Sequence, residues 1–324
     1  MSGEPARRLL LVGGAGGFVG RALLPELAGA FRVRSVHRHR VPVEEAEAVE
    51  WVARDVASCP DWARLLEGVD AVVNLAWYRA GPRTRFVALR EGLERLLAAS
   101  VRAGVRRFVQ LSVPPAPPSL ERGLPYLVEK RRFDAALAGS GLPYRILRPT
   151  MLFGPGDVLL SVMLRTIRRY GRFPMFGDGR YHVSPLAVAD LARLLRRELD
   201  GAAVGVRDLG GPRRFEYREL TDLLFAAAGR SPRYWRLTER GGVRLARLLE
   251  LTGRHLLYAY EVEWLVSDLL GLPPASEGLL PVESYLGRAR GFSDGPARPS
   301  APEFKPPADP SDADGSLGPR PPSR

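Results

Sequence analysis

Residues 9–20 read LLLVGGAGGFVG, a short apolar run followed by five glycines within eight residues. The apolar run predicts a buried strand, and residues 17–29 (GFVGRALLPELAG) have the spacing of a helix that packs on a sheet. Where such a helix begins, its first N–H groups are unpaired and its dipole is positive. Because glycine has no Cβ, a ligand can approach the backbone there. The stretch therefore predicts a strand, a tight turn and a helix that together bind an anion.

Three of these glycines, Gly14, Gly17 and Gly20, have the spacing GxxGxxG. We expect the first to make the turn, the second to allow close approach of a pyrophosphate, and the third to let the helix pack on the strand. Phe18 and Val19 lie between the last two glycines and are expected beside the cofactor. The pattern predicts a dinucleotide site because it lies between a strand and a helix, and an ordinary tight turn is the alternative.

The second predicted strand indicates which dinucleotide binds. NAD-binding units usually carry Asp or Glu near the end of this strand, where the carboxylate bonds the ribose 2′-OH. Here residues 31–38 read FRVRSVHR, and no acid follows Arg38 before Glu44. A guanidinium at this place suits the 2′-phosphate of NADP. We therefore predict NADP(H) as the preferred cofactor and NAD(H) as the alternative, while an exposed strand-end arginine without a ligand is the competing interpretation.

Apolar runs alternate with helical patterns through the first half of the chain. Strands are predicted at residues 7–12, 31–38, 71–77, 106–113 and 143–150, and helices at 17–29, 61–68, 85–104 and 125–141. Such alternation predicts an α/β fold of the Rossmann type, in which a doubly wound parallel sheet carries helices on both faces. A smaller C-terminal lobe is expected to follow.

The chain divides into three predicted parts. We expect an NAD(P)-binding Rossmann domain at residues 1–150 and a substrate lobe at 151–285, of which about 181–200 return to the core. A tail at 286–324 contains nine prolines and almost no apolar residues. Because it cannot bury enough apolar surface to order itself, the tail is predicted to be disordered.

Composition limits the classes of protein that fit. The 324 residues include one cysteine, Cys59, so no internal disulfide forms and a reducing, cytoplasmic location is predicted. No run of 18 apolar residues occurs, so no transmembrane segment is expected. The formal net charge of +12 suits an acidic or phosphorylated ligand, although a solvated arginine-rich surface accounts for most arginines. Scattered arginines without interleaved aromatic residues predict no nucleic-acid partner.

Several segments together resemble a known family. They are VGGAGGFVG (12–20), RDV (54–56), GVDAVVNLA (68–76), LPYRILRPTMLFGPGD (142–157), HVSPLAVADLA (182–192) and DLGGPRRFEYREL (208–220). In this order they resemble the extended and atypical short-chain dehydrogenase/reductases. That group includes nucleotide-sugar epimerase/dehydratase-like proteins and the complex I accessory subunit of this fold. The resemblance covers about residues 7–285.

The resemblance implies further cofactor contacts. Asp55 and Val56 would lie near the adenine, and Leu75 and Ala76 would line the cofactor cleft. The segment from Pro149 to Leu152, which includes Met151, would lie near the nicotinamide.

The catalytic signature of the family, YxxxK, is present as Tyr126 and Lys130 in PYLVEKRR. Residues four apart share one helix face, and an ammonium near a phenol lowers its pKa, which makes tyrosine usable as an acid and base. In the family this lysine also holds the nicotinamide ribose. Only Lys130 and Lys305 are lysines among 48 cations, so a surface helix lysine without a function is a weak alternative.

The chain departs from the family pattern beside the predicted strand at 106–113. Ser112 is the candidate catalytic serine, but Val113 occupies the usual serine position, and the interval to Tyr126 is short. Two functions therefore remain open. One is an oxidoreductase or epimerase-like enzyme that uses Tyr126 and Lys130 on a small-molecule substrate, acidic or nucleotide-linked. The other is a cofactor-binding sensor or assembly subunit with little or no turnover.

Two remaining features predict little by themselves. His37 and His39 lie at a strand end without a carboxylate or cysteine ligand nearby, so no metal is expected. Residues 158–173 form an amphipathic segment with clustered arginines, which is expected to cover the substrate cleft. Peripheral contact with a membrane surface is the alternative for this segment. No pattern indicates the oligomeric state.

Overall fold

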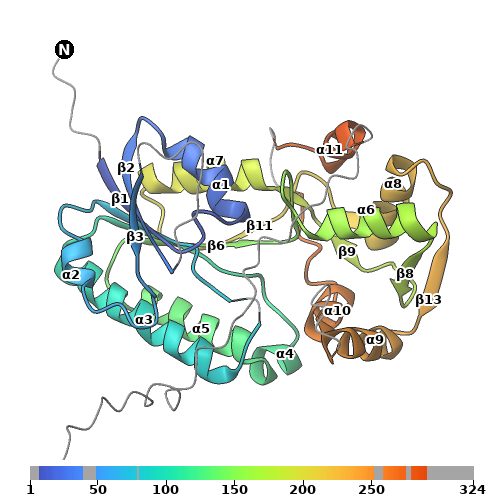
Figure 1. Ribbon diagram of the computed structural model, residues 1–324, viewed down its shortest axis with the longest axis horizontal. Helices are drawn as coiled ribbons and strands as arrows, with labels where there is room; N and C mark the ends of the chain where they lie inside the picture. The colour runs from blue at the N-terminus through green and yellow to red at the C-terminus, as the bar shows by residue number, and fades with distance from the viewer. Residues whose placement is uncertain (1–6, 39–48, 79, 252–257, 275–278, 290–324) are drawn as a thin grey trace, which may run out of the picture. The chain divides into compact units, whose positions relative to one another are not determined.

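The strand predicted at residues 7–12 lies inside a seven-stranded parallel sheet in the computed structural model (Figure 1). The structure describes residues 7–38, 49–78, 80–251, 258–274 and 279–289. The strands of the sheet are β1 (Arg7–Val12), β2 (Phe31–His37), β3 (Val49–Ala53), β4 (Ala71–Asn74), β5 (Arg107–Leu111), β6 (Tyr144–Pro149) and β11 (Gly205–Leu209). Their order, β11-β6-β5-β4-β1-β2-β3, changes direction beside β1, as in doubly wound folds.

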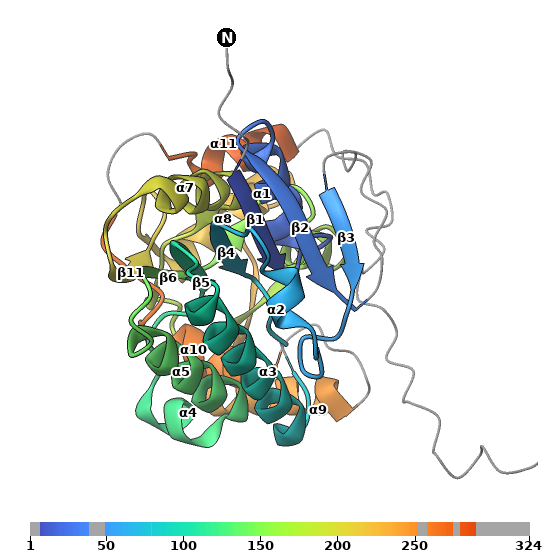
Figure 2. The same ribbon diagram turned by 90° about the vertical axis from the view of Figure 1, so that its left-hand side faces the viewer.

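Helices cover both faces of this sheet, as Figure 2 shows. On one face lie α1 (Phe18–Leu27) and α7 (Val188–Asp200), and on the other lie α2 (Trp62–Leu65), α3 (Arg83–Arg102) and α5 (Pro125–Ala138). Within β1, Leu9 and Leu11 face the first layer, and Leu10 and Val12 face the second. A strand buried on both faces reads as a continuous apolar run, which explains LLLV. The predicted fold class is confirmed.

The lobe has its own core, built around Phe153, Phe215 and Phe225. Its helices are α6 (Leu159–Tyr170), α8 (Tyr217–Ala227), α9 (Glu239–Leu251), α10 (Ala259–Val266) and α11 (Val282–Ala289). Its short strands are β7 (Leu152–Phe153), β8 (Phe173–Phe176), β9 (His182–Val183), β10 (Leu186–Ala187), β12 (Phe215–Glu216) and β13 (Tyr234–Leu237). These pair as β10 with β7, β12 with β9 and β13 with β8.

Four elements extend or correct the predicted organisation. Strand β3 and the short helix α4 (Pro118–Gly123) were not among the predicted elements. The segment that returns to the sheet reaches beyond residue 200, because β11 pairs with β6 after α7. The ordered lobe also passes the predicted boundary at 285, since α11 continues to Ala289 and buries Leu286. The rest of the predicted tail, 290–324, lies outside the described residues.

The described helices can be tested for membrane-spanning length. None of those within the described ranges is both long enough and apolar enough to cross a bilayer. The predicted amphipathic segment is helix α6, whose Leu160, Met163 and Ile167 pack into the lobe core.

Candidate functional site

The turn between β1 and α1 has little room for side chains. Gly14 has φ +69°, and the N–H of Gly17 donates to the Gly14 carbonyl oxygen at 2.8 Å. A Cβ on Gly20 would lie 2.0 Å from that same oxygen. Gly14 and Gly17 are exposed, whereas Gly20 is buried under the turn. The turn therefore presents an open backbone, and the third glycine allows helix α1 to lie directly against it.

The same turn packs against the segment that follows β4. Gly13 has φ +66°, and a Cβ there would lie 2.6 Å from the Cβ of Ala76. A Cβ on Gly14 would lie 3.0 Å from the Cβ of Leu75, whose N–H donates to the Val12 carbonyl at 2.9 Å. The structure thus brings the glycine loop together with Leu75 and Ala76, two of the residues that the family resemblance assigned to the cofactor cleft.

Helix α1 begins at Phe18, and its first turn contains no acidic residue. Phe18 and Val19 are half-buried at this end, and Arg21 donates from Nε to the Gly16 carbonyl at 2.9 Å. The helix end therefore combines exposed glycine backbone with a nearby guanidinium. This cradle, which any Cβ would fill, fits the pyrophosphate of a dinucleotide.

Arg38 follows β2 at the same edge of the sheet. It is exposed, and its guanidinium carbon lies 5.2 Å from the centre of the Tyr78 ring. The guanidinium carbon of Arg85, from the first turn of α3, lies 3.8 Å from the centre of the same ring. Two guanidinium groups therefore converge on one tyrosine. Nearby, the Asp55 carboxylate accepts from the Ala57 N–H at 2.9 Å.

Helix α3 closely approaches the segment after β3, which contains Asp55 and Val56. Val56 is buried, and its carbonyl oxygen would lie 2.0 Å from a Cβ on Gly92. Asp55 remains half-exposed at the edge, where an adenine could reach it.

The chain's single asparagine and single glutamine bond to each other. Asn74 Nδ2 donates to Gln110 Oε1 at 2.7 Å, and both side chains are fully buried. Asn74 Oδ1 also accepts the N–H of Ala76 at 3.0 Å. This pair joins the ends of β4 and β5 and holds the backbone of the segment that faces the glycine loop.

Helix α5 carries the predicted catalytic pair. Lys130 is 3% exposed, and its Nζ lies 4.5 Å from the centre of the Trp77 ring. Burial lowers the pKa of Lys130 to about 8, the Asp134 carboxylate acts in the opposite direction, and Arg131 lowers it further. At neutral pH the ammonium is therefore mostly charged, and the indole face stabilises it.

Tyr126 lies one turn before Lys130 and lines a cavity of about 490 Å³. Its ring meets the rings of Trp77 and Phe86 edge to face, with centroids 6.4 and 6.1 Å away, and stacks on Tyr260 at 5.9 Å. Trp77 follows Ala76 directly, so the segment after β4 and the predicted catalytic pair meet at this tryptophan.

Ser112 points toward helix α5. Its Oγ donates to Asp134 Oδ2 at 2.5 Å, and both residues are buried. Val113 joins an apolar cluster that includes Tyr126 and Tyr260. Arg131 donates to the carbonyl oxygen of Val113 at 2.9 Å. Hydrogen bonds therefore join the loop after β5 to α5, and the Ser112 hydroxyl is one of the groups that make them.

The segment after β6 connects the sheet to the lobe. Pro149 ends β6 and is buried, as is Met151, whose carbonyl accepts the Leu186 N–H at 2.8 Å. Between them Thr150 Oγ1 donates to the Ser184 carbonyl at 2.5 Å. These contacts hold Pro149 and Met151 at the same edge of the sheet as the glycine loop.

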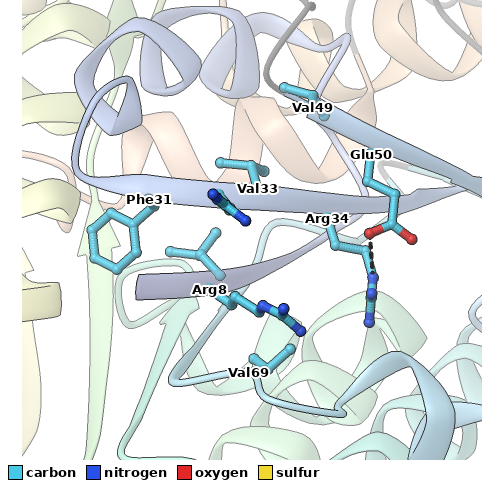
Figure 3. A pocket seen from close by; sticks show the side chains of 9 residues that line it. Arg8, Phe31, Val33, Arg34, Val49, Glu50 and Val69 are labelled. Atoms are coloured by element: carbon cyan, nitrogen blue, oxygen red, sulfur yellow. Dashed lines mark hydrogen bonds and ion pairs between the residues drawn. The ribbon is translucent and has the colours of Figure 1, made fainter. Parts of the chain in front are cut away.

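We also searched the described residues for a metal site and for a second hollow. Within the described ranges, no group of three or more His, Cys, Asp or Glu residues could hold a metal ion. His39 lies outside those ranges. A hollow of about 560 Å³ lies at the other edge of the sheet and is lined by Arg8, Arg32 and Arg34 (Figure 3).

Known proteins resemble this chain in sequence. Residues 14–163 match a family model described as NAD(P)H-binding. The (4-alkanoyl-5-oxo-2,5-dihydrofuran-3-yl)methyl phosphate reductase of Streptomyces griseus is 31% identical over 254 residues, which are 74% of this chain and 79% of that protein. The chain belongs to the extended short-chain dehydrogenase/reductase family.

Other members of the extended short-chain dehydrogenase/reductase family are also similar. The ceramide reductase of Caulobacter vibrioides is 28% identical over 76% of this chain and 78% of that protein. The mitochondrial NADH dehydrogenase [ubiquinone] 1 alpha subcomplex subunit 9 of Arabidopsis thaliana is 28% identical over 44% of this chain, which spans only 35% of that subunit. The UDP-N-acetylglucosamine 4-epimerase of Methanobrevibacter ruminantium shares the fold, with TM-score 0.63, 16% identity, and coverage of 89% of this chain and 97% of that one.

Sequence reasoning missed three residues of this short-chain dehydrogenase/reductase site. Trp77 contacts both Tyr126 and Lys130. The Asp134 charge raises the pKa of Lys130, and the Tyr260 ring, from the lobe, stacks on Tyr126. The spacing of Lys130 and Asp134, four residues apart on one helix, could have indicated the second of these. No local signal marks Tyr260, because more than 130 residues separate it from its partner.

Proposed function

We propose that this chain is an NAD(P)H-dependent reductase that converts a carbonyl group to an alcohol beside Tyr126. The observation that carries the proposal is the first half of helix α5, where a tyrosine lines a cavity and a buried, charged lysine lies one turn further on. Two similar family members, from Streptomyces griseus and Caulobacter vibrioides, are named as reductases, which supports reduction over epimerisation.

The dinucleotide is held, in this proposal, by the glycine loop at Gly14, Gly17 and Gly20. Its further contacts come from the start of α1 and from the segments that follow β3, β4 and β6. These contacts are Phe18, Val19, Asp55, Val56, Leu75, Ala76, Pro149 and Met151, with Lys130 at the nicotinamide ribose. When bound, the reduced dinucleotide supplies a hydride to the carbonyl carbon and is oxidised as the carbonyl is reduced.

Tyr126 donates the proton that the carbonyl oxygen needs as the hydride arrives at the carbon. The Lys130 ammonium, fixed between the Trp77 face and α5, favours the phenolate that this transfer leaves behind. The proton returns to the phenolate from solvent. Ser112 acts indirectly, because its hydroxyl is bonded to Asp134, which helps to keep Lys130 charged.

NADP(H) is the cofactor that we propose. Arg38 directly follows β2, and both it and Arg85 lie near the Tyr78 ring, where we place the adenosine ribose of a dinucleotide on this loop. Like charges beside one ring repel each other, and a 2′-phosphate that accepts from both guanidinium groups would offset that repulsion.

A second candidate is a cofactor-binding sensor or assembly subunit without turnover. Val113 and Tyr260 place apolar groups around Tyr126, and Ser112 is engaged by Asp134. Part of the chain is also similar to a protein named as a subunit of NADH dehydrogenase [ubiquinone]. These observations favour binding without catalysis.

One experiment separates the two candidates. Hydride transfer from labelled NADPH to a panel of carbonyl compounds and nucleotide sugars is measured for wild type, Tyr126→Phe and Lys130→Arg. Tyr260→Phe is the matched control, because it removes a hydroxyl from the same cavity and keeps the ring that stacks on Tyr126. We expect Tyr126→Phe to lower turnover by about 10²-fold or more and Lys130→Arg to lower it strongly, since a planar fork cannot replace a compact ammonium.

The reductase proposal fails if no candidate substrate reacts with wild type while both variants bind NADPH as wild type does. It also fails if Tyr126→Phe and Tyr260→Phe lower turnover equally, because the loss would then reflect the cavity rather than proton transfer.

A further inference from the structure

We infer that the cavity beside Tyr126 binds an alkyl or acyl chain, so that the substrate is a carbonyl compound with a long apolar chain rather than a nucleotide sugar. The inference rests on the proposed reductase function for its chemistry. It rests on the cavity lining for the class of substrate, and it departs from the acidic or nucleotide-linked substrate expected from the sequence.

The walls of the cavity come from two parts of the molecule. Helices α4 and α5 and the start of α3 contribute Phe86, Leu120 and Leu124, and the lobe contributes Tyr258 and Tyr260 from the start of α10. The volume, about 490 Å³, lies within the range of small-molecule sites. Most of this lining is apolar or aromatic, which is the surface that a hydrocarbon chain prefers.

Three tyrosine rings lead away from the proposed proton donor. Tyr126 stacks on Tyr260 with centroids 5.9 Å apart and planes 23° apart, and Tyr260 stacks on Tyr258 at 5.6 Å and 17°. Rings stacked in this way form a continuous wall of apolar carbon. A substrate whose carbonyl reaches Tyr126 would therefore lay its remaining length along this wall.

The charges of the cavity argue against a diphosphate. Among the residues that line the cavity, Arg247 carries positive charge, and Glu250 and Glu263 carry negative charge. Glu250 already accepts the N–H of Ala259 at 2.6 Å. A nucleotide diphosphate needs several donors or cations, and two carboxylates would repel it.

The outer surface of the same wall is also apolar. Helix α9 supplies Arg247 and Glu250 to the cavity, and Leu245, Leu248 and Leu251 on this helix are 37%, 59% and 85% exposed. Leucines three residues apart lie near one another on a helix. An amphiphilic substrate would contact this surface before its chain enters the cavity.

The test uses a series of 2-alkanones of increasing length with NADPH-loaded protein, and UDP-glucose as the competing probe. Binding is measured by calorimetry, and kcat/KM is measured separately. We expect affinity to rise about fourfold per added methylene, equal to about 0.8 kcal/mol, until the cavity is filled. UDP-glucose should not compete.

Variants connect this slope to the cavity. Leu124→Asn places a polar group in the wall and should flatten the dependence on chain length, and Tyr258→Ala should do the same if the first variant folds poorly. Leu269→Asn changes an exposed leucine of the lobe that does not line the cavity, and it should leave the dependence unchanged. An affinity independent of chain length, or UDP-glucose binding in place of the alkanones, overturns the inference.

Two outcomes separate this inference from the proposed function. If alkanones bind with the expected dependence on chain length but never accept hydride, the chain-binding site is supported and the reductase proposal is rejected. Short carbonyl compounds that are reduced without any gain from added methylenes retain the reductase and reject the chain site.

Discussion

The two edges of the parallel sheet both contain arginines and a hollow, but they are built differently. At the carboxyl edge, the glycine loop packs against the segment after β4, and Arg38 at the end of β2 lies near the Tyr78 ring. At the amino edge, Arg8 and Arg32 line the larger hollow of Figure 3 together with apolar strand residues. By volume and arginine content alone, the amino edge would be the better anion site.

The difference lies in what the backbone offers. In Figure 3, Arg34 points to Glu50, with Nε and Oε2 2.8 Å apart, and it also donates to the Leu65 carbonyl at 2.7 Å. The Arg34 guanidinium is therefore already bonded to acceptors of the protein. The carboxyl edge instead presents exposed glycine backbone and a helix N-terminus. The arginines of the amino edge are partly occupied by the protein's own acceptors, whereas the carboxyl edge offers backbone without side chains at the start of a helix, where an anion is favoured.

The comparison predicts the largest effect for Gly20→Ala. The new Cβ would lie 2.0 Å from the Gly14 carbonyl oxygen and 2.5 Å from the Ala15 Cα, so the turn must shift. We expect a loss of about 3 kcal/mol or more of unfolding free energy. A backbone displacement of about 1 Å should also lower NADPH affinity by about a hundredfold. Urea unfolding and fluorescence titration measure the two effects.

Gly287→Ala is the matched control, because Gly287 also lies in a helix, α11, but a Cβ there meets nothing within 4 Å. It should be stabilising by up to about 1 kcal/mol through helix propensity. If both substitutions act alike, the close contact at Gly20 has no energetic consequence, and the proposed role of the turn is wrong.

A second prediction concerns Lys130, whose burial should cost stability at neutral pH. The folded-state pKa is about 8, below the ordinary value of 10.5, so Lys130→Met should stabilise the protein without cofactor by up to about 3 kcal/mol at pH 7. The same variant should bind NADPH more weakly. Arg122→Met, which removes an exposed cation of α4, is the control and should change neither property.

The sign of the pH dependence follows from proton binding. Below pH 8 the lysine is charged in both states, and the folded protein bears the full cost of burying it. Between about pH 8 and 10.5 the unfolded state binds more protons, so wild-type stability should rise with pH and approach that of Lys130→Met. Urea titrations at pH 7 and pH 10 check this. A constant difference between the two proteins would contradict the low pKa.

The glycine loop could be predicted from the sequence because all its determinants are local. Gly14, Gly17 and Gly20 lie within seven residues, and the strand before them and the helix after them follow from the apolar pattern. The resemblance likewise predicted Leu75 and Ala76, and the structure places both against the loop. Sequence spacing therefore predicts those parts of the fold and of the site whose determinants lie close together in the chain.

The surroundings of Tyr126 could not be predicted in the same way. They are assembled from Trp77, Phe86 and Val113 of the sheet domain and Tyr260 of the lobe, which are distant in sequence and meet only in the folded chain. Strand β3 was missed because its burial is only partial, so its apolar pattern is weak. The direction of Ser112 depends on Asp134, which lies on another element.

A third prediction tests the polar pair beneath the site. Asn74→Ala removes the acceptor of the Ala76 N–H and leaves the buried Gln110 Oε1 without its donor. We expect a loss of about 2 kcal/mol in unfolding free energy, measured by urea unfolding. The double variant Asn74→Leu/Gln110→Leu should recover part of this loss, because no buried polar side chain remains there. A double variant less stable than Asn74→Ala would show that the pair stabilises the sheet beyond satisfying its own groups.

The smallest expected effect compares two arginines at opposite ends of one strand region. Arg38→Ala should weaken NADPH binding about tenfold, equal to about 1.4 kcal/mol, and leave NADH binding unchanged, because NADH has no 2′-phosphate. Arg32→Ala, at the amino edge shown in Figure 3, should change neither affinity. Fluorescence titrations at two salt concentrations add a second readout, since the Arg38 contribution should shrink as salt screens an exposed ion pair.

Equal losses for both nucleotides would assign Arg38 to a part of the cofactor that they share. Equal affinities of wild type for NADPH and NADH would reject the NADP(H) preference, because a 2′-phosphate bound by two guanidinium groups must favour the nucleotide that carries it.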